Sequence, residues 1–550
     1  MGPLLRPQSP ETSAADEIPS ETTLINQVTH PYGLSYVKVE SVGLVTGLVA
    51  SGSDPAFSPQ RAALLAEMNR REVDDPNKVL ASRDTALVLV RGFLRPGIRE
   101  GDPFDIEVRI PSQSDATSLR NGWLLETRLT ELAVLGDQIR KGHLLAVSQG
   151  PVLVDPSASV KEDAAWATRG RVLGGGIATK TRNLGLVLDH ELQSVRLSQQ
   201  IGKAINRRFH SYSDGRQQGI ASPKTDEFIE LQLHPRYKDN VGRFMRVVRN
   251  IAVRETSQNL QSRLQLLSSQ LLDPVTSATA ALRLEAVGDE EAISILEQGL
   301  VADDPEVRFY SSEALAYLDV TDAVESLART AREEPAFRVH ALAALSAMDD
   351  GAAYDALREL LEVKSAETRY GAFRALWAMS PGDPLVHGQD LAGQFTFHTL
   401  DVPGPAMIHV TSSHRPEIVM FGSDHQFKLP LVLDAGQRIL VNGLSGGKIK
   451  ISRFGETTQQ RVVSTRVEDV VRTVVELGGT YPDVVEMLQQ ANESKALKSR
   501  FRVNALPETG RQIMRSSKAL ADQTGSSGEI LQTSYEVDTP RSELFGQNNE

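Results

Sequence analysis

The chain has 550 residues, which is too long for one hydrophobic core and predicts about three or four domains. Its formal net charge of −12 argues against a protein that mainly coats nucleic acid, and the lack of cysteine excludes disulfides, thiol nucleophiles and Cys-based metal sites. No apolar run reaches the roughly 18 residues that a membrane span needs, so no membrane span is predicted.

Both ends of the chain are polar. Residues 1–28 are rich in Pro, Ser, Thr and acidic residues, which predicts a flexible N-terminal lead. This stretch lacks the apolar core of a signal peptide, so we expect either a cytoplasmic protein or an export signal upstream of Met1. Residues 507–550 are similarly polar and are predicted to be a disordered tail.

Residues 29–262 have a mixed α/β pattern. Ile106 and Val108 alternate with Glu107 and Arg109, the period of a strand with one buried face. The apolar run at 86–90 predicts a buried strand, and apolar residues at helical spacing predict a helix after Pro59.

Within this region, residues 203–254 hold eleven Lys or Arg against five acidic residues. Such an excess suits either an anionic partner or a solvated face balanced by acids elsewhere, and the second explanation is slightly favoured. Nucleic acid is the weakest option, because few aromatic residues lie between the basic ones.

Residues 263–382 form a helical block with an internal repeat. Arg308, Arg338 and Arg369 recur at spacings of 30 and 31, each before an Ala/Leu-rich run, which resembles short HEAT-like repeats stacked into a solenoid. In such a stack the three arginines are expected to form a ladder along one edge. They would bridge acids of neighbouring units, such as Glu306, Glu334 and Glu367. The surface that binds an unknown protein partner would then be another part of the solenoid.

Residues 383–462 predict short strands, and residues 463–506 predict two helices and a closing strand. The first helix runs through Val467–Val475 and ends at Gly478-Gly479, and the second begins at a capping box of Thr480 and Asp483 and continues to about Leu497. The expected fold class is α+β, with an all-α HEAT-like solenoid and a small β-rich segment.

The search for chemistry identifies no catalytic, metal-binding or cofactor-binding residue. Gly443–Gly447 has the G-x-S-x-G spelling of a nucleophile elbow, but the alternating residues 448–452 favour a Gly-rich hairpin turn. The trio Asp189-His190-Glu191 is better explained as a solvated charged run than as a metal site, because adjacent residues do not converge on one ion.

Several motifs between residues 43 and 150 follow a familiar order. They contain Gly43, Gly47, Gly52 and Asp54, then Arg95, Pro96 and Gly97, then Asp115, Ser118, Leu119 and Gly122, and finally Gln149 and Gly150. Together with Val470–Ala505, these blocks resemble the P-ring protein family of the bacterial flagellar basal body.

The resemblance implies a non-enzymatic subunit of a periplasmic ring that surrounds the flagellar rod and contributes to motility. The expected partners are further copies of the chain, the rod and L-ring proteins, and peptidoglycan. The motif residues would then be structural. The alternative is a non-flagellar cell-envelope scaffold that binds a protein partner through its HEAT-like repeats.

Overall fold

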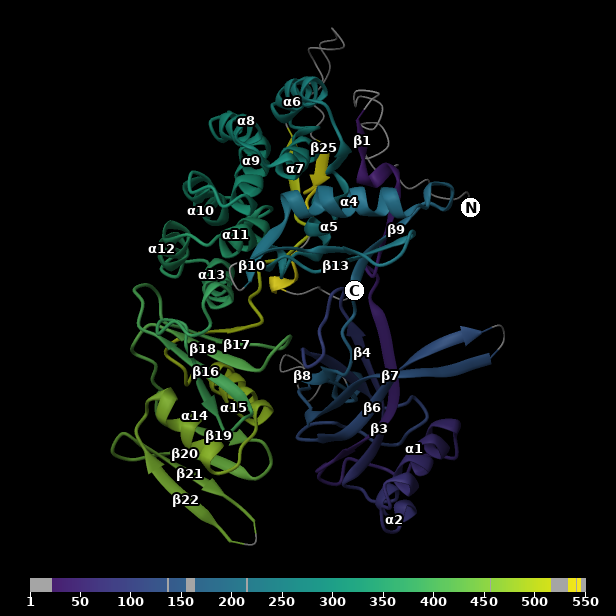
Figure 1. Ribbon diagram of the computed structural model, residues 1–550. Coiled ribbons are helices and arrows are strands. Elements are labelled where there is room, and N and C mark those ends of the chain that lie inside the picture. The colour runs from purple at the N-terminus through teal and green to yellow at the C-terminus, as the bar shows by residue number, and fades with distance from the viewer. Residues whose placement is uncertain are drawn as a thin grey trace.

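The computed structural model of the protein describes residues 22–135, 138–154, 164–213, 216–455, 457–515, 533–540 and 542–545. Their helices and strands form a β-barrel, a small sheet with helices beside it, a helical solenoid and a β-rich unit (Figure 1). The predicted α+β class, with an all-α solenoid and a separate β-rich segment, is confirmed.

The barrel closes in the strand order β3-β4-β5-β8-β7-β6. Its strands are β3 (Val37–Thr46), β4 (Thr85–Leu94), β5 (Pro103–Arg109), β6 (Trp123–Leu135), β7 (Gln138–Pro151) and β8 (Arg169–Ala178). The alternation in β5 buries Ile106 and Val108 inside the barrel and leaves Arg109 exposed outside. Helix α1 (Pro59–Arg70) begins where predicted and buries Leu64 and Met68 against the outer side, close to α2 (Pro76–Leu80), while α3 (Ala164–Ala167) precedes β8.

The second unit is an antiparallel sheet with strand order β12-β13-β9-β2. The strands are β2 (Thr29–Tyr32), β9 (Leu184–Leu188), β12 (Ala221–Pro223) and β13 (Phe228–Leu231), and the small pairs beside them are β1 (Thr23–Leu24) with β14 (Ala252–Arg254) and β10 (His210–Ser213) with β11 (Arg216–Gly219). Helix α4 (Val195–Arg208) packs on this sheet, and α5 (Val241–Arg249) packs against the solenoid.

The prediction of a flexible lead over residues 1–28 is wrong for residues 22–28. Leu24 and Ile25 are 1% and 0% exposed, and the Ile25 amide donates to the Ile251 carbonyl, because this apolar pair inserts into the core between α5 and the sheet. Residues 1–21 lie outside the described residues.

The solenoid consists of antiparallel helices packed as successive pairs. They are α6 (Ser257–Leu271), α7 (Ser277–Val287), α8 (Glu290–Leu300), α9 (Pro305–Tyr317), α10 (Ala323–Glu333), α11 (Arg338–Ala347), α12 (Gly351–Leu360) and α13 (Ala366–Met379). Helices α8, α10 and α12 line its outer side, and α9, α11 and α13, which are buried along almost their whole length, line its inner side (Figure 1). The predicted boundary at 262/263 falls inside α6, whose apolar face already packs on α7.

The β-rich unit contains two sheets with one core. The first sheet has the order β15-β16-β18-β17-β23 and the second the order β19-β20-β21-β22. The elements are β15 (Gln389–Leu391), β16 (Phe395–Leu400), β17 (Met407–Val410), β18 (Glu417–Phe421), β19 (Val432–Ala435), β20 (Ile439–Leu444), β21 (Lys448–Arg453), β22 (Gln459–Val463), α14 (Val467–Glu476), α15 (Tyr481–Glu493) and β23 (Arg500–Val503).

Two details of this unit bear on the sequence predictions. The hairpin at Gly443–Gly447 is confirmed, since β20 and β21 pair across it with Leu444 opposite Lys448. The predicted division at 462/463 is wrong, because β23 pairs with β17 and the apolar faces of α14 and α15 fill the same core as both sheets.

The prediction of a disordered tail over residues 507–550 is also wrong in part. Strands β24 (Gln512–Arg515) and β25 (Thr533–Glu536) pair, and residues 537–540 and 542–545 then run between the solenoid and α5 (yellow in Figure 1). We call residues 537–540 and 542–545 the C-terminal segment. Thr539, Ser542 and Leu544 are buried there. The hydroxyls of Thr539 and Ser542 form hydrogen bonds to distant parts of the chain, and local composition does not reveal such partners. Residues 516–532, 541 and 546–550 lie outside the described residues.

Candidate functional site

The sequence motifs gather at the ends of the barrel. The segment after β3 lies against the segment before β6: the Thr117 amide donates to the Ser51 carbonyl at 2.9 Å, and the Ser51 hydroxyl donates to the Ser118 carbonyl at 3.0 Å. The Ser53 and Ser114 hydroxyls are 3.1 Å apart. Two motif blocks that are more than 60 residues apart in the chain therefore form one backbone contact.

Two glycines allow close packing beside this contact. A Cβ on Gly52 would lie 2.1 Å from the Thr85 carbonyl oxygen, and a Cβ on Gly122 would lie 2.4 Å from Val45 Cγ1. Real Cβ atoms do not approach this closely, so the backbone could not close here with any other residue. Leu119, in the second of these blocks, is fully buried.

The remaining motif residues have varied surroundings. Gly43 lies on β3, where a Cβ would meet Thr127 Oγ1 at 2.7 Å, and Gly47 and Gly150 have positive φ angles of +79° and +142°. Asp54 forms an ion pair with Arg61 at 3.2 Å. The side chains of Asp115 and Gln149 are exposed. Most of these positions shape backbone, and none brings reactive groups together.

Arg95, Pro96 and Gly97 lie at the turn after β4. Arg95 Nη2 is 3.3 Å from Asp102 Oδ2, and Arg95 Nη1 is 3.1 Å from Glu543 Oε2, while the Tyr36 hydroxyl donates to Glu543 at 3.2 Å. Burial raises the pKa of Glu543, although Arg95 and Tyr36 favour its charged form. This motif thus contacts the C-terminal segment.

A buried ionic cluster joins α5 to the solenoid. Arg243 of α5 lies 2.6 Å from Glu285 of α7 and 2.6 Å from Glu313 of α9, and these side chains are 1%, 0% and 3% exposed. Burial raises the pKa of Glu313, and Arg243 opposes that shift. Sequence reasoning missed this cluster, because nothing local distinguishes Arg243 from the other basic residues near it.

The basic segment 203–254 faces the solenoid through several further contacts. Arg236 pairs with Asp319 at 2.7 Å, Lys238 Nζ donates to the Ala378 carbonyl at 2.7 Å, and Arg208 Nη2 donates to the Glu285 carbonyl at 3.0 Å. Part of this segment therefore faces the helical block of the same chain, through one acidic side chain and through backbone carbonyls.

The repeat arginines contact helix ends. Arg308 donates to the Ala302 carbonyl at 2.7 Å, Arg338 to the Ala331 carbonyl at 2.9 Å, and Arg369 to the Leu361 carbonyl at 2.7 Å. Each arginine thus satisfies carbonyl groups at or just after the C-terminus of the preceding helix, where a cation is also favoured by the helix dipole.

The expected bridges to neighbouring acids are mostly replaced by these contacts. Among the described residues, only Arg338 of the three forms an ion pair, with Glu367 at 3.2 Å. The prediction that all three arginines bridge acids is therefore wrong, because Arg308 and Arg369 instead donate to carbonyls at the end of the preceding helix.

A groove of about 1540 Å³ lies on the outer face of the barrel beside α1. Glu40, Arg91, Glu107 and Arg171 stand in register across β3, β4, β5 and β8, with 2.8 Å between Arg91 and Glu40 and 4.0 Å between Arg171 and Glu107. The whole lining contains eight Lys or Arg and four Glu. The groove is therefore a positively charged surface.

Neither a metal-binding cluster nor a membrane-spanning helix occurs among the described residues. They contain no group of three His, Asp or Glu side chains placed to hold a metal ion. Across the same residues, no helix combines the length and apolar character needed to cross a membrane.

Two family models match different parts of the chain. Residues 25–261 match the family model of the flagellar P-ring protein, and residues 298–377 match that of HEAT repeats. The C-terminal stretch Val470–Ala505 lies outside the matched P-ring span.

Individual curated flagellar P-ring proteins are also similar to this chain. The chain is 26% identical over 244 residues to that of Thermotoga maritima, covering 42% of this chain and 68% of the relative. The corresponding values are 27% over 217 residues for Hydrogenovibrio crunogenus (38% and 56%) and 27% over 234 residues for Photorhabdus laumondii (42% and 61%). Residues 25–261 are thus similar to flagellar P-ring proteins, and residues 298–377 are similar to HEAT repeats.

Proposed function

We propose that the protein is a structural, non-enzymatic subunit of a flagellar P-ring, or of a P-ring-like periplasmic ring around the rod, and that it contributes to motility. The observation that carries this proposal is the family match over residues 25–261, which spans the barrel and the sheet with α4 and α5. Several motif glycines there lie where a Cβ would clash with neighbouring atoms, which supports a structural role for them.

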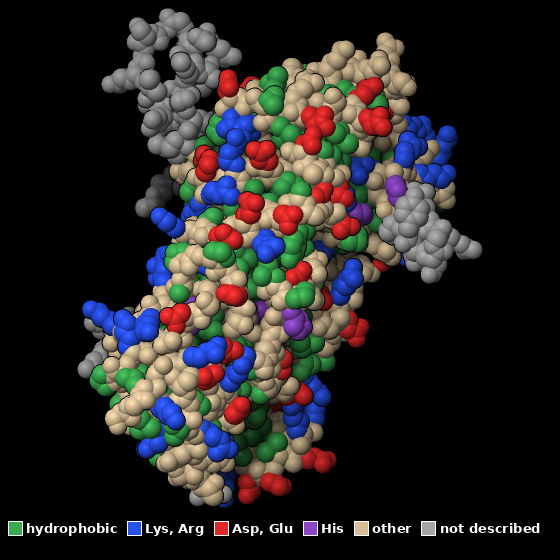
Figure 2. Space-filling view, turned by 90° about the vertical axis from the view of Figure 1, so that its left-hand side faces the viewer, with side chains coloured by type: hydrophobic (Ala, Val, Ile, Leu, Met, Phe, Trp, Pro, Cys, Tyr) green, Lys and Arg blue, Asp and Glu red, His purple; other side chains and the backbone are tan. Residues whose placement is uncertain are grey.

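A ring requires a head-to-tail interface that closes on itself. The basic groove beside α1 is our candidate for one side of it, with a second copy as the occupant. Residues 289–304, which include α8, carry six acidic residues and no Lys or Arg and provide a complementary surface. Acidic side chains are spread over the upper half of the solenoid face in Figure 2.

The proposal includes further partners and a location. The ring would contact the rod and L-ring proteins and peptidoglycan, and the chain would reach the periplasm with an export signal encoded upstream of Met1. An in-frame stop codon directly before Met1, together with a cytoplasmic protein, would contradict this part.

The direct test is a gene deletion with complementation. We expect the deletion strain to lose swimming, and the tagged chain to restore it and to co-purify with basal bodies as rings visible by electron microscopy. Arg109→Glu with Arg169→Glu, two exposed groove residues, should reduce ring yield, whereas Arg358→Glu on α12 provides a charge-matched control outside the groove. Normal rings from the double variant would exclude the groove as the interface.

The second candidate is a non-flagellar envelope scaffold that binds a protein partner through the HEAT repeats. It is favoured by the outer face of the solenoid, where Val301 is 84% exposed beside the acids of α8. Unimpaired swimming of the deletion strain, with a chain that stays monomeric by mass photometry, would support this candidate over the ring.

A further inference from the structure

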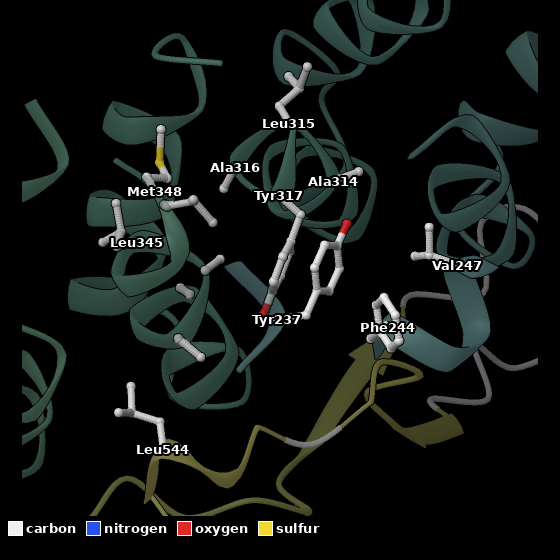
Figure 3. Close-up of a cluster of buried hydrophobic side chains, with 14 of the residues drawn as sticks. Tyr237, Phe244, Val247, Ala314, Leu315, Ala316, Tyr317, Leu345, Met348 and Leu544 are labelled. Carbon is white, nitrogen blue, oxygen red and sulfur yellow. The ribbon is translucent and has the colours of Figure 1, made fainter. Parts of the chain in front are cut away.

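The C-terminal segment is held by side chains of other elements. Its only regular structure is the single 3-10 turn Glu543–Phe545. It runs past the buried cluster of Tyr237, Tyr317 and Phe244, and Leu544 projects from it toward the inner helices of the solenoid (Figure 3). The position of the C-terminal segment therefore depends on its contacts with these side chains.

One position of the segment requires a hydroxyl group. The Thr539 hydroxyl donates to Glu313 Oε2 at 2.9 Å and accepts from Arg243 Nη1 at 3.2 Å. Thr539 is 8% exposed, and both partners are buried. Valine has the same shape but would leave a buried carboxylate oxygen and a buried guanidinium N–H without this partner.

The backbone of the segment is bound at several points. The Asp538 amide donates to the Tyr310 hydroxyl at 3.1 Å, Asn240 Nδ2 donates to the Pro540 carbonyl at 3.3 Å, and Arg374 Nη2 donates to the Leu544 carbonyl at 3.3 Å. These contacts come from α9, from the residue before α5 and from α13. Binding of main-chain groups in this way is typical of sites for extended peptides.

The end of the segment adds a charge and an apolar anchor. Glu543 pairs with Arg95 at 3.1 Å, and its amide donates to the Asp239 carbonyl at 2.6 Å. Leu544 is 5% exposed and belongs to the main core of the solenoid. The segment thus contacts the barrel, the α5 unit and the solenoid within nine residues.

We infer that α5, α9, α13 and the turn at Arg95 form a peptide-binding site. Its ligand class is a peptide with the pattern Thr-Pro-x-Ser-Glu-Leu that ends in a 3-10 turn, and this chain supplies it from its own residues 539–544. The inference does not depend on the proposed ring. Occupation of the site joins the solenoid to the barrel.

The test separates the ligand from the site after folding. A protease recognition sequence is inserted after Thr524 in the full chain, and the folded protein is cleaved there. The C-terminal fragment should co-elute with the remainder in size-exclusion chromatography, and a fluorescent peptide of residues 537–550 should replace it. Peptides with Thr539→Val or Leu544→Asp should bind at least tenfold more weakly than the unmodified peptide, whereas Thr539→Ser, which keeps the hydroxyl that Glu313 and Arg243 contact, should bind nearly as tightly.

Two results would overturn the inference. The first is separation of the fragment immediately after cleavage, and the second is equal binding of the Thr539→Val, Leu544→Asp and unmodified peptides. If the inserted sequence prevents folding, hydrogen exchange of the chain without the insertion provides the test. Thr539→Val must then accelerate exchange of the Asp538 and Glu543 amides relative to Thr539→Ser. Unchanged exchange would also overturn the inference.

Discussion

Arg95 and Glu543 form an ion pair of 3.1 Å across 448 positions of the chain. Arg95 belongs to a motif within the span that matches the P-ring family, and Glu543 lies beyond both matched spans. The motif turn therefore also binds a part of the chain that the family match does not cover.

The first prediction concerns this pair. Arg95→Gln and Glu543→Gln should each lower the free energy of unfolding, and their double-mutant cycle should give a coupling of about 1 kcal/mol or less, because Arg95 remains about one-third exposed. Denaturant unfolding of the four proteins measures the coupling. A coupling of zero would show that this ion pair does not contribute to the free energy of unfolding.

A larger effect is expected at Arg243. Its replacement by Met leaves Glu285 and Glu313 buried without their cation, so the free energy of unfolding should fall by about 3–5 kcal/mol. Arg246→Met, in the same helix but at an exposed pair with Asp538, should cost less than about 1 kcal/mol. Equal losses in thermal or denaturant unfolding would contradict the role of the buried cluster.

Local patterns predicted the elements well and their long-range pairing poorly. The alternation at Ile106 and Val108, the helix after Pro59 and the hairpin at Gly443–Gly447 follow from spacing and turn chemistry alone. Closure of the barrel depends on pairing between strands that are far apart, which periodicity does not encode.

The contacts of the C-terminal segment could not be predicted from local sequence either. Thr539 and Glu543 look like tail residues by composition. Their partners, Glu313 and Arg95, lie 226 and 448 positions away. Burial of a polar residue depends on such partners, so sequence composition predicted disorder where the structure has order.

The third prediction concerns pH and the buried polar cluster around Glu417. Burial lowers the pKa of His398 to about 4 and that of His409 to about 3, although Glu417 favours their charged forms. Burial alone would raise the pKa of Glu417, but Arg374 and Arg415 lower it to about 2. Tyr370 also hydrogen-bonds to this carboxylate.

The direction of the pH effect follows from these pKa values. Below pH 6.5 the unfolded chain protonates both histidines while the folded chain does not, so stability should fall by up to about 1.4 kcal/mol per pH unit for each histidine. The contribution of Glu417 is present above about pH 4.3 and is lost between there and pH 2. Denaturant unfolding between pH 8 and pH 5 should show a smaller slope for His409→Gln, and parallel slopes would exclude His409 as a source.

The fourth prediction ranks substitutions in the solenoid. Leu345→Ala removes a fully buried side chain and should cost about 2–5 kcal/mol. Arg308→Ala, at a partly exposed side chain that donates to two carbonyls, should cost about 1 kcal/mol. Arg369→Ala should lie between them, because Arg369 is 1% exposed and donates to the Leu361 and Pro405 carbonyls. Thermal unfolding of the full chain gives the order, and a larger loss for Arg308→Ala than for Leu345→Ala would contradict the stacked core.

The last prediction tests whether the motif glycines are structural. Gly52→Ala places a Cβ 2.1 Å from the Thr85 carbonyl oxygen, and this backbone atom cannot move without shifting the start of β4. Overpacking of this kind should cost at least about 1–3 kcal/mol and separate the segment after β3 from that before β6. Gly382→Ala, where nothing lies within 4 Å of the new Cβ, is the matched control and should unfold like the unmodified chain. Hydrogen exchange at Thr117, whose amide donates to the Ser51 carbonyl, reports on the contact directly. If Gly52→Ala keeps both the unfolding midpoint and the protection of Thr117, close packing is not what these glycines provide.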